Sequence, residues 1–283
     1  IINEGTNNKI TSNIANINNL GNDTVYIYST DTRGRVTNNT NLKSTGYLNY
    51  GIYSAGTVEN KGNIDFSSGY GNVGIYSIKG GNANNTGNIT VGKTMEISTP
   101  TASDPTKTTT YYAIGMAAGY TPESGTGYTG NITNAGTINV NGDGGSIGMY
   151  GTESGTRVIN NGTINLSGAN STAIYGKFAE ILNDTTGTIN VGASSAALYG
   201  VKSSKLENKG TINIGANSVG IFSKGDIAAG YKIGATTYKG LVSNSGKIIS
   251  TGKSIGVTYN GIGSGAVDAR VTNETTGKIN LAG

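Results

Sequence analysis

The amino-acid sequence predicts an all-β fold, a right-handed parallel β-helix that forms one solenoid domain over residues 1–283. Three observations predict this fold. A unit of 22 to 26 residues recurs about ten times, apolar residues alternate with period two, and the composition combines 47 glycines with only 13% charged residues. The same composition without a repeat would indicate a disordered chain, whereas a repeat of this length is typical of a solenoid.

One half of the unit reads apolar–x–Asn–x–Gly–x–Ile–x–apolar, as at residues 58–66, 158–166 and 206–214. Stacking of successive units places the asparagines in one column, where their amides can hydrogen-bond from coil to coil. We interpret this column as a structural ladder, and the glycine two residues later as a position suited to positive φ. The marker asparagines are Asn3, Asn38, Asn60, Asn85, Asn134, Asn160, Asn183, Asn208, Asn244 and Asn273.

The other half of the unit carries an apolar–Gly/Ala–Ile–Tyr motif, as at residues 73–76 and 147–150. Each unit has three short apolar segments between Gly, Asn and Ser turns and lacks a helical period, which predicts three strands per coil. One unit cannot bury its apolar face alone, but stacked parallel coils form a continuous core, and a right hand is favoured for such connections. The predicted inward columns are Ile64, Ile89, Ile138, Ile164, Ile189, Ile212, Ile248 and Ile279, and Ile52, Ile75, Met116, Met149, Ile174, Leu198, Ile221 and Val257.

An aromatic column follows the second inward column, at Tyr53, Tyr76, Tyr150, Tyr175, Tyr199 and Phe222. Alternation predicts that these rings point outward, beside a groove of small residues such as Gly74 and Gly148. An exposed aromatic stripe suits stacking on sugar rings or on partner side chains. The alternative is that the stacked rings only stabilise neighbouring coils.

Four insertions interrupt the repeat, at residues 92–112, 117–130, 223–240 and 259–270. We expect them to project as loops on one edge of the rod, although the first follows a different strand of its coil from the other three. Insertions of a solenoid often form its binding face, and the alternative is that they are decorations without a partner. The candidate partner-binding residues, from these loops and the aromatic column, are Tyr111, Tyr112, Tyr120, Tyr128, Tyr231, Tyr238, Lys239, Tyr150, Tyr175 and Tyr199.

The composition excludes several kinds of chemistry. Without His or Cys there is no Ser-His-Asp or Cys-His catalysis, no disulfide and no His- or thiolate-ligated metal. The 16 acidic residues scatter, and the cations form no run, so we expect no catalytic residues, no metal, no cofactor and no nucleic-acid partner. We therefore expect the protein not to be an enzyme, and a polysaccharide-acting β-helix enzyme is the weakest of the functions considered.

The units at residues 136–151, 162–177 and 187–202 resemble passenger repeats of type V autotransporters, in particular the large outer-membrane adhesins typified by RadD. This resemblance implies a β-helical stalk on the surface of a Gram-negative bacterium. It implies adhesion to a host receptor or glycan, or to a partner bacterium in coaggregation, as part of virulence. It also implies anchoring through a C-terminal outer-membrane barrel that this sequence does not contain. Because the chain opens inside a repeat, we expect it to be a monomeric fragment of a longer passenger.

Two functions follow from these observations. In the first, this segment is a binding module whose loops or tyrosines contact a surface receptor, either a protein or a glycan. In the second, it is a spacer that holds a distal tip away from the cell.

Overall fold

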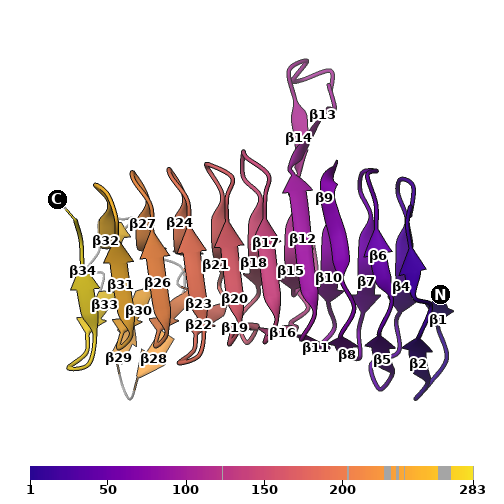
Figure 1. Ribbon diagram of the computed structural model, residues 1–283, viewed down its shortest axis with the longest axis horizontal. Coiled ribbons are helices and arrows are strands. Elements are labelled where there is room, and N and C mark those ends of the chain that lie inside the picture. Colours follow the sequence, from indigo (N-terminus) through magenta and orange to yellow (C-terminus); the bar gives the residue numbers. More distant parts are fainter. Residues whose placement is uncertain are drawn as a thin grey trace.

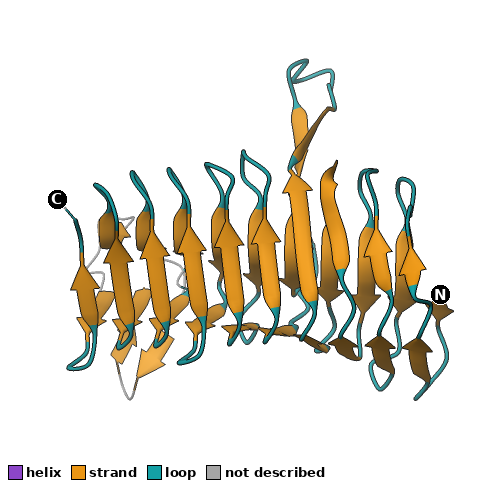
Figure 2. Ribbon diagram, in the orientation of Figure 1, coloured by secondary structure: helices purple, strands orange, loops and turns teal. Residues whose placement is uncertain are grey.

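The computed structural model describes residues 1–122, 124–202, 204–225, 231–233, 236–238, 240–260 and 269–282. The chain forms a right-handed parallel β-helix, in which three sheets of ten strands each run along one rod (Figure 1). The described residues contain strands and turns but no helix (Figure 2). Each coil contributes one strand to each sheet, so the predicted fold class, the three strands per coil and the number of coils are confirmed.

We call the three sheets A, B and C, in the order in which each coil visits them. Sheet A contains β1 (Ile2–Asn3), β4 (Val25–Ser29), β7 (Tyr50–Ser54), β10 (Val73–Ser77), β15 (Ile114–Ala118), β18 (Ile147–Thr152), β21 (Thr172–Lys177), β24 (Ala196–Val201), β27 (Val219–Lys224) and β32 (Ile255–Asn260). Sheet B contains β2 (Lys9–Ser12), β5 (Arg35–Asn38), β8 (Thr57–Asn60), β11 (Asn82–Asn85), β16 (Asn131–Asn134), β19 (Arg157–Asn160), β22 (Glu180–Asn183), β25 (Lys205–Asn208), β30 (Gly240–Asn244) and β33 (Ala269–Asn273). Sheet C contains β3 (Asn16–Ile17), β6 (Asn41–Lys43), β9 (Ile64–Tyr70), β12 (Asn88–Lys93), β17 (Thr137–Val140), β20 (Thr163–Leu166), β23 (Thr188–Val191), β26 (Thr211–Ile214), β31 (Lys247–Ser250) and β34 (Lys278–Asn280).

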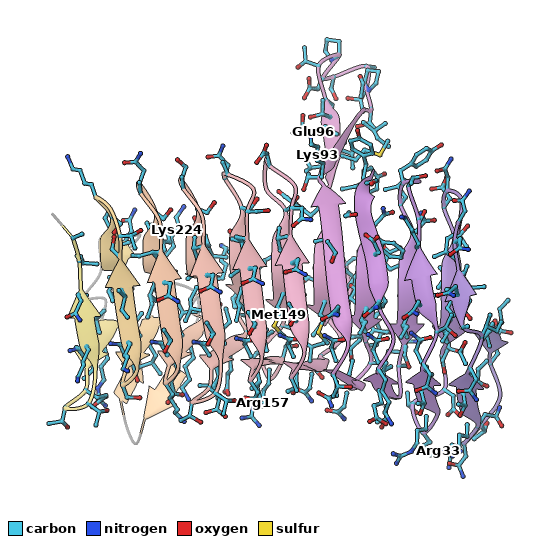
Figure 3. All side chains as sticks on the ribbon, viewed as in Figure 1. Arg33, Lys93, Glu96, Met149, Arg157 and Lys224 are labelled. Carbon is cyan, nitrogen blue, oxygen red and sulfur yellow. The ribbon has the colours of Figure 1, made fainter. Side chains whose placement is uncertain are left out.

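The two predicted inward columns form a large part of the core, together with apolar residues of sheet B and further residues of sheet C. The prediction is wrong for Ile279, which lies in the last coil and is 37% exposed. Ile75 pairs in parallel with Ile52 on one side and with Met116 on the other, and Ile164 pairs in the same way with Ile138 and Ile189. All six side chains are fully buried. Figure 3 shows Met149 inside the rod and Arg157 on its outer surface. Burial of such an aliphatic side chain contributes about 1.5–3 kcal/mol to folding, so repetition of the column in every coil holds the rod together.

The asparagine ladder lies inside the rod, at the end of each sheet B strand. Each amide from Asn38 to Asn244 donates to the Oδ1 of the asparagine in the next coil, over 2.7–2.9 Å. In most coils the same amide nitrogen also donates to the carbonyl oxygen of the glycine two residues later, as Asn60 does to Gly62 at 3.0 Å. Asn60, Asn85, Asn134, Asn160, Asn183, Asn208 and Asn244 are buried. The predicted ladder is therefore present, and each interior member satisfies its neighbours' polar groups.

The prediction that Asn3 belongs to the asparagine ladder is wrong. Asn3 lies in β1 of sheet A, pairs with Ser29 and donates to the Oγ of that serine at 3.2 Å. The residue that pairs with Asn38 in the first coil is Ser12, whose hydroxyl bonds the hydroxyls of Tyr26 and Thr40. The first coil thus begins earlier in its repeat than the sequence pattern indicates.

The glycine two residues after the ladder asparagine has a different role from the predicted one. Positive φ occurs at other glycines, in turns such as those at Gly71 and Gly145. At Gly162 an added Cβ would overlap the carbonyl oxygen of Gly136, and at Gly87 it would overlap that of Gly62. These positions require glycine because the turns of neighbouring coils touch there. The reason for the glycine is therefore steric contact between coils and not the predicted positive φ.

Two further ladders were not foreseen. On the outer face of sheet C, Asn165, Asn190 and Asn213 each donate to the asparagine of the preceding coil over 2.8–2.9 Å, beginning at Asn139. At the corner between sheets C and A, buried serines donate to glycine carbonyl oxygens of the preceding turn, as Ser171 does to Gly142 at 3.0 Å. Repeated polar contacts of this kind replace salt bridges, which accounts for the low content of charged residues.

The insertions leave the rod at two corners. The first forms an antiparallel hairpin of β13 (Met95–Ser98) and β14 (Thr108–Tyr111) between sheets C and A, and it projects beyond the row of turns in Figure 1. The other three follow sheet A strands and enter sheet B, and residues 223–240 contain a second hairpin of β28 (Tyr231–Ile233) and β29 (Thr236–Tyr238). The flanking strands of these three agree with the expectation of one shared edge, although residues 226–230, 234–235, 239 and 261–268 lie outside the described ranges. The expectation is wrong for the first insertion, which follows a sheet C strand. No helical segment within the described ranges has the length and hydropathy needed to cross a bilayer.

Candidate binding groove

The outer faces of the three sheets differ in chemistry. Sheet C presents the amides of Asn139, Asn165, Asn190 and Asn213. Sheet B presents charges, with Arg157 Nε 3.8 Å from Glu180 Oε2. Sheet A presents aromatic and aliphatic side chains, which is unusual for a face in contact with water.

A local departure from alternation produces the apolar face of sheet A. Gly74 and Ile75 both face the interior, since a Cβ on Gly74 would lie 2.8 Å from the side chain of Ile89. Val73 and Tyr76 consequently both face outward, and Tyr50, which pairs with Val73, stacks on Tyr76 at 6.2 Å between ring centroids. The prediction of a glycine groove beside the tyrosines is therefore wrong, because those small residues fill crowded positions in the core.

The aromatic column itself is present, with Tyr53 and Tyr76 in edge-to-face contact and the rings from Tyr150 onward stacked. Tyr150, Tyr175, Tyr199 and Phe222 form a continuous stack with ring centroids 4.6–5.7 Å apart and ring planes within 13° of parallel. The rings are half-buried rather than fully exposed. Burial raises the pKa of Tyr175 to about 12. The outward direction is confirmed, and the stacking shows that the rings stabilise neighbouring coils.

The column is interrupted in one coil. Ala117 pairs with Tyr76 on one side and with Tyr150 on the other, at the position where a tyrosine would continue the stack. Tyr76 leans across this position and donates from its hydroxyl to the Gly119 carbonyl oxygen at 2.9 Å. The stack therefore breaks between Tyr76 and Tyr150, beside the corner from which the 92–112 hairpin projects.

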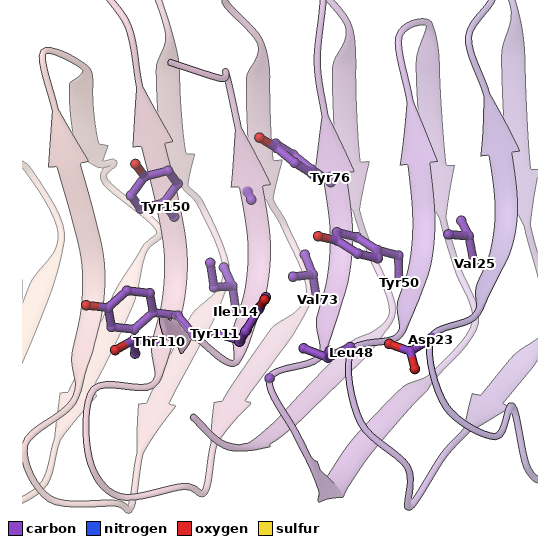
Figure 4. Close-up of a pocket in the computed structure, with 13 residues that line it drawn as sticks. Asp23, Val25, Leu48, Tyr50, Val73, Tyr76, Thr110, Tyr111, Ile114 and Tyr150 are labelled. Atoms are coloured by element: carbon purple, nitrogen blue, oxygen red, sulfur yellow. The ribbon is translucent and has the colours of Figure 1, made fainter. Parts of the chain in front are cut away.

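A groove of about 470 Å³ lies at this break (Figure 4). Val73, Ile114 and Ala117 form its apolar floor, with Tyr50 and Tyr76 on one side and Tyr150 on the other. Burial raises the pKa of Tyr50, Tyr76 and Tyr150, which reflects how far these walls are removed from water. The groove is lined by Asp23, Val25, Leu48, Tyr50, Gly71, Val73, Tyr76, Thr110, Tyr111, Tyr112, Ile114, Ala117 and Tyr150. We call it the tyrosine groove.

The base of the first hairpin supplies the remaining wall. Tyr111 packs against the turn at Gly71, where an added Cβ would lie 3.1 Å from the Tyr111 Cβ. Tyr112 lies over the next turn, 3.4 Å from the corresponding position at Gly145. Both glycines have positive φ, and the absence of a Cβ at each leaves room for the tyrosine beside it. The two tyrosines therefore diverge and close opposite ends of the same side of the groove.

The predicted partner-binding residues separate into four groups. Tyr111, Tyr112 and Tyr150 line the tyrosine groove, whereas Tyr175 and Tyr199 continue the stack beyond it. Tyr120 and Tyr128 exchange two backbone hydrogen bonds in the 117–130 loop, and Lys79 lies 5.7 Å from the centre of the Tyr128 ring. Tyr231 and Tyr238 pair across the second hairpin, but their side chains and all of Lys239 lie outside the described residues.

Several groove residues were missed in the sequence, among them Asp23, Leu48, Tyr50 and Ile114. They come from three different coils and are brought together only by stacking. One signal was available: the aromatic column lacks a member in the coil of Met116, where Ala117 occupies the register of the tyrosines. Within the described residues, acidic side chains form no cluster of three or more that could hold a metal ion.

Comparison with known protein families gives a match for part of the chain. Residues 66–179 match a family model described as the BigA third pectate lyase-like domain. The matched segment includes the first hairpin and the part of the groove from Val73 to Tyr150. No curated protein and no solved structure matches the chain.

Proposed function

We propose that this chain is a segment of a cell-surface adhesin whose β-helix binds a receptor on another cell through the tyrosine groove. The observation that carries the proposal is the groove itself. In a rod whose other described faces are lined by amide ladders and ion pairs, it combines an apolar floor with aromatic walls, of which Tyr111 and Tyr112 are exposed. Such concave, mostly apolar sites with a few polar groups are typical of binding sites.

Two further observations support a surface adhesin. The match to a pectate lyase-like domain of BigA spans the hairpin and most of the groove, and the repeats resemble autotransporter passengers. The receptor is accordingly a host surface molecule or a component of a partner bacterium, and the segment is displayed on the outer surface of the cell that makes it.

We propose binding rather than catalysis. Acid–base chemistry on a saccharide needs two carboxylates facing one bond. Among the described residues that line the groove, Asp23 is the only one with a carboxylate.

Removal of the hairpin tests the proposed function. Deletion of residues 95–111 joins Thr94 to Tyr112 and leaves residues 92–94 and 112–113 between Val91 and Ile114. This matches the length of the 167–171 turn between the equivalent positions Leu166 and Thr172. The coil should therefore close normally. We expect adherence of cells that display the full chain to fall to the level of cells without it, because Tyr111 is lost and Tyr112 loses its support.

The matched control is Tyr120→Ala with Tyr128→Ala, which removes two equally exposed tyrosines outside the groove and should leave adherence unchanged. Unchanged adherence after the hairpin deletion, with the deleted protein folded by circular dichroism, would instead favour the spacer function. The unbroken order of ten stacked strands in each sheet suits that alternative.

A further inference from the structure

We propose that the tyrosine groove binds a neutral saccharide chain, laid along the rod with the apolar faces of its rings against the tyrosines. The inference rests on the proposed function for the location of the receptor and adds the chemistry of that receptor. Three properties of the groove lead to it: its combination of rings and hydroxyls, its charge and its direction.

The groove offers apolar surface and hydroxyl groups together. Its floor is aliphatic and its walls carry five phenol rings, with the Thr110 hydroxyl beside them. Within the described part of the chain, the hydroxyls of Tyr50, Tyr111 and Tyr112 have no hydrogen-bond partner, unlike that of Tyr76. A pyranose ring has one apolar C–H face and a rim of hydroxyls, so it can stack on a phenol ring and exchange hydrogen bonds with the rim.

The charge of the groove distinguishes neutral from anionic saccharides. Asp23 is the only charged residue among its described lining residues, and no Lys or Arg is present there to pair with a carboxylate or sulfate. A sialylated or sulfated chain would bring its anions to a site without a cation and with one carboxylate of the same sign. The groove therefore favours a neutral chain.

The direction of the groove favours a chain over a single sugar. Along the rod, the groove spans the adjacent sheet A strands β4, β7, β10, β15 and β18, and the turns and hairpin beside them supply the rest of its lining. Neighbouring strands lie about 4.8 Å apart, so the groove extends roughly 19 Å along the rod. Tyr50 and Tyr76 lie toward one end and Tyr150 toward the other (Figure 4). Several linked rings are needed to contact both ends.

The test measures binding of defined saccharides to the purified 283-residue chain. The probes are maltotetraose, chitotetraose and lacto-N-neotetraose as neutral chains, with a heparin tetrasaccharide and sialyllactose as anionic ones. Saturation-transfer NMR detects which probe binds, and intrinsic tyrosine fluorescence gives the affinity without interference, because the chain has no Trp. We expect at least one neutral chain to bind and neither anionic chain to bind more tightly.

Variants assign the binding to the groove. Tyr111→Ala with Tyr112→Ala should weaken binding about tenfold or more, since two stacking contacts are lost, whereas Tyr111→Phe with Tyr112→Phe keeps the rings and should retain most of it. Both substituted residues are exposed, Tyr111 by 38% and Tyr112 by 48%, so neither pair of substitutions should affect folding. Tyr120→Ala with Tyr128→Ala, at side chains 44% and 42% exposed, is the matched control.

Three results would overturn the inference: no neutral probe binds, an anionic probe binds more tightly, or the alanine pair in the groove binds as the wild type does. Cells stripped of glycans distinguish this failure from failure of the proposed function. If they still bind the wild type and binding still requires the hairpin, the receptor is a protein, so the adhesin function stands and the saccharide inference is wrong. If the hairpin deletion leaves adherence intact, the proposed function fails regardless of the saccharide result.

Discussion

Replacement of Asn160 with alanine is expected to lower the free energy of unfolding by about 2–4 kcal/mol, because it opens the buried ladder in the middle of the rod. Asn160 accepts from Asn134 at 2.9 Å and donates to Asn183 at 2.8 Å and to the Gly162 carbonyl at 3.1 Å. The variant leaves the Oδ1 of Asn183 and the carbonyl oxygen of Gly162 without this donor inside the protein. Chemical denaturation of wild type and variant measures the difference.

The matched control is Asn165→Ala in the outer ladder. Asn165 also bonds to asparagines on both sides, at 2.9 and 2.8 Å, but it is only half-buried, so water can replace the lost amide. We expect a loss of no more than about 1 kcal/mol. Equal losses of unfolding free energy at Asn160 and Asn165 would show that burial of the inner ladder adds nothing to its contribution to stability.

Gly162→Ala is expected to destabilise the rod by about 3 kcal/mol or more, because the new Cβ overlaps the Gly136 carbonyl oxygen of the preceding turn. That carbonyl belongs to the backbone and receives the amide of Thr163 at 2.9 Å, so it cannot move without breaking coil-to-coil pairing. Thermal unfolding of the variant measures the effect.

Gly252→Ala serves as the control for this substitution. Its nearest neighbour would be the Ala216 methyl carbon at 3.2 Å, which can shift slightly. A small change is therefore expected at residue 252, and a similarly small change at residue 162 would contradict the steric role of the glycine column.

The fold could be predicted from the sequence because a solenoid repeats the same contacts in every coil. The recurrence of isoleucine at the positions of Ile138, Ile164 and Ile189 shows that this position faces the core. The recurring asparagines of the ladder indicate their environment in the same way. Where the pattern has no second copy, prediction failed, as for Asn3 in the first coil. The sequence also cannot show which backbone atoms face a glycine, and for this reason the roles of Gly162 and Gly74 became evident only from the stacked coils.

The candidate site was predicted in part. Tyr111, Tyr112 and Tyr150 were identified because aromatic residues in a loop and in an exposed column suggest binding. Asp23, Leu48 and Tyr50 were not, since the sequence distance from Asp23 to Tyr150 is closed only when five coils stack. The local departure from alternation that turns Val73 outward, and with it the floor of the groove, also has no signature in the sequence of the strand.

The most direct test is to map which tyrosines of the chain the receptor covers. The chain is iodinated under limiting conditions, alone and when bound to receptor-bearing cells, and modified tyrosines are quantified by mass spectrometry. The account predicts that bound cells protect Tyr111 and Tyr112 of the tyrosine groove, while Tyr120, Tyr128 and Tyr70, all exposed outside it, react as before. Protection of Tyr120 and Tyr128 instead, or of no groove tyrosine while the cells remain bound, would contradict it.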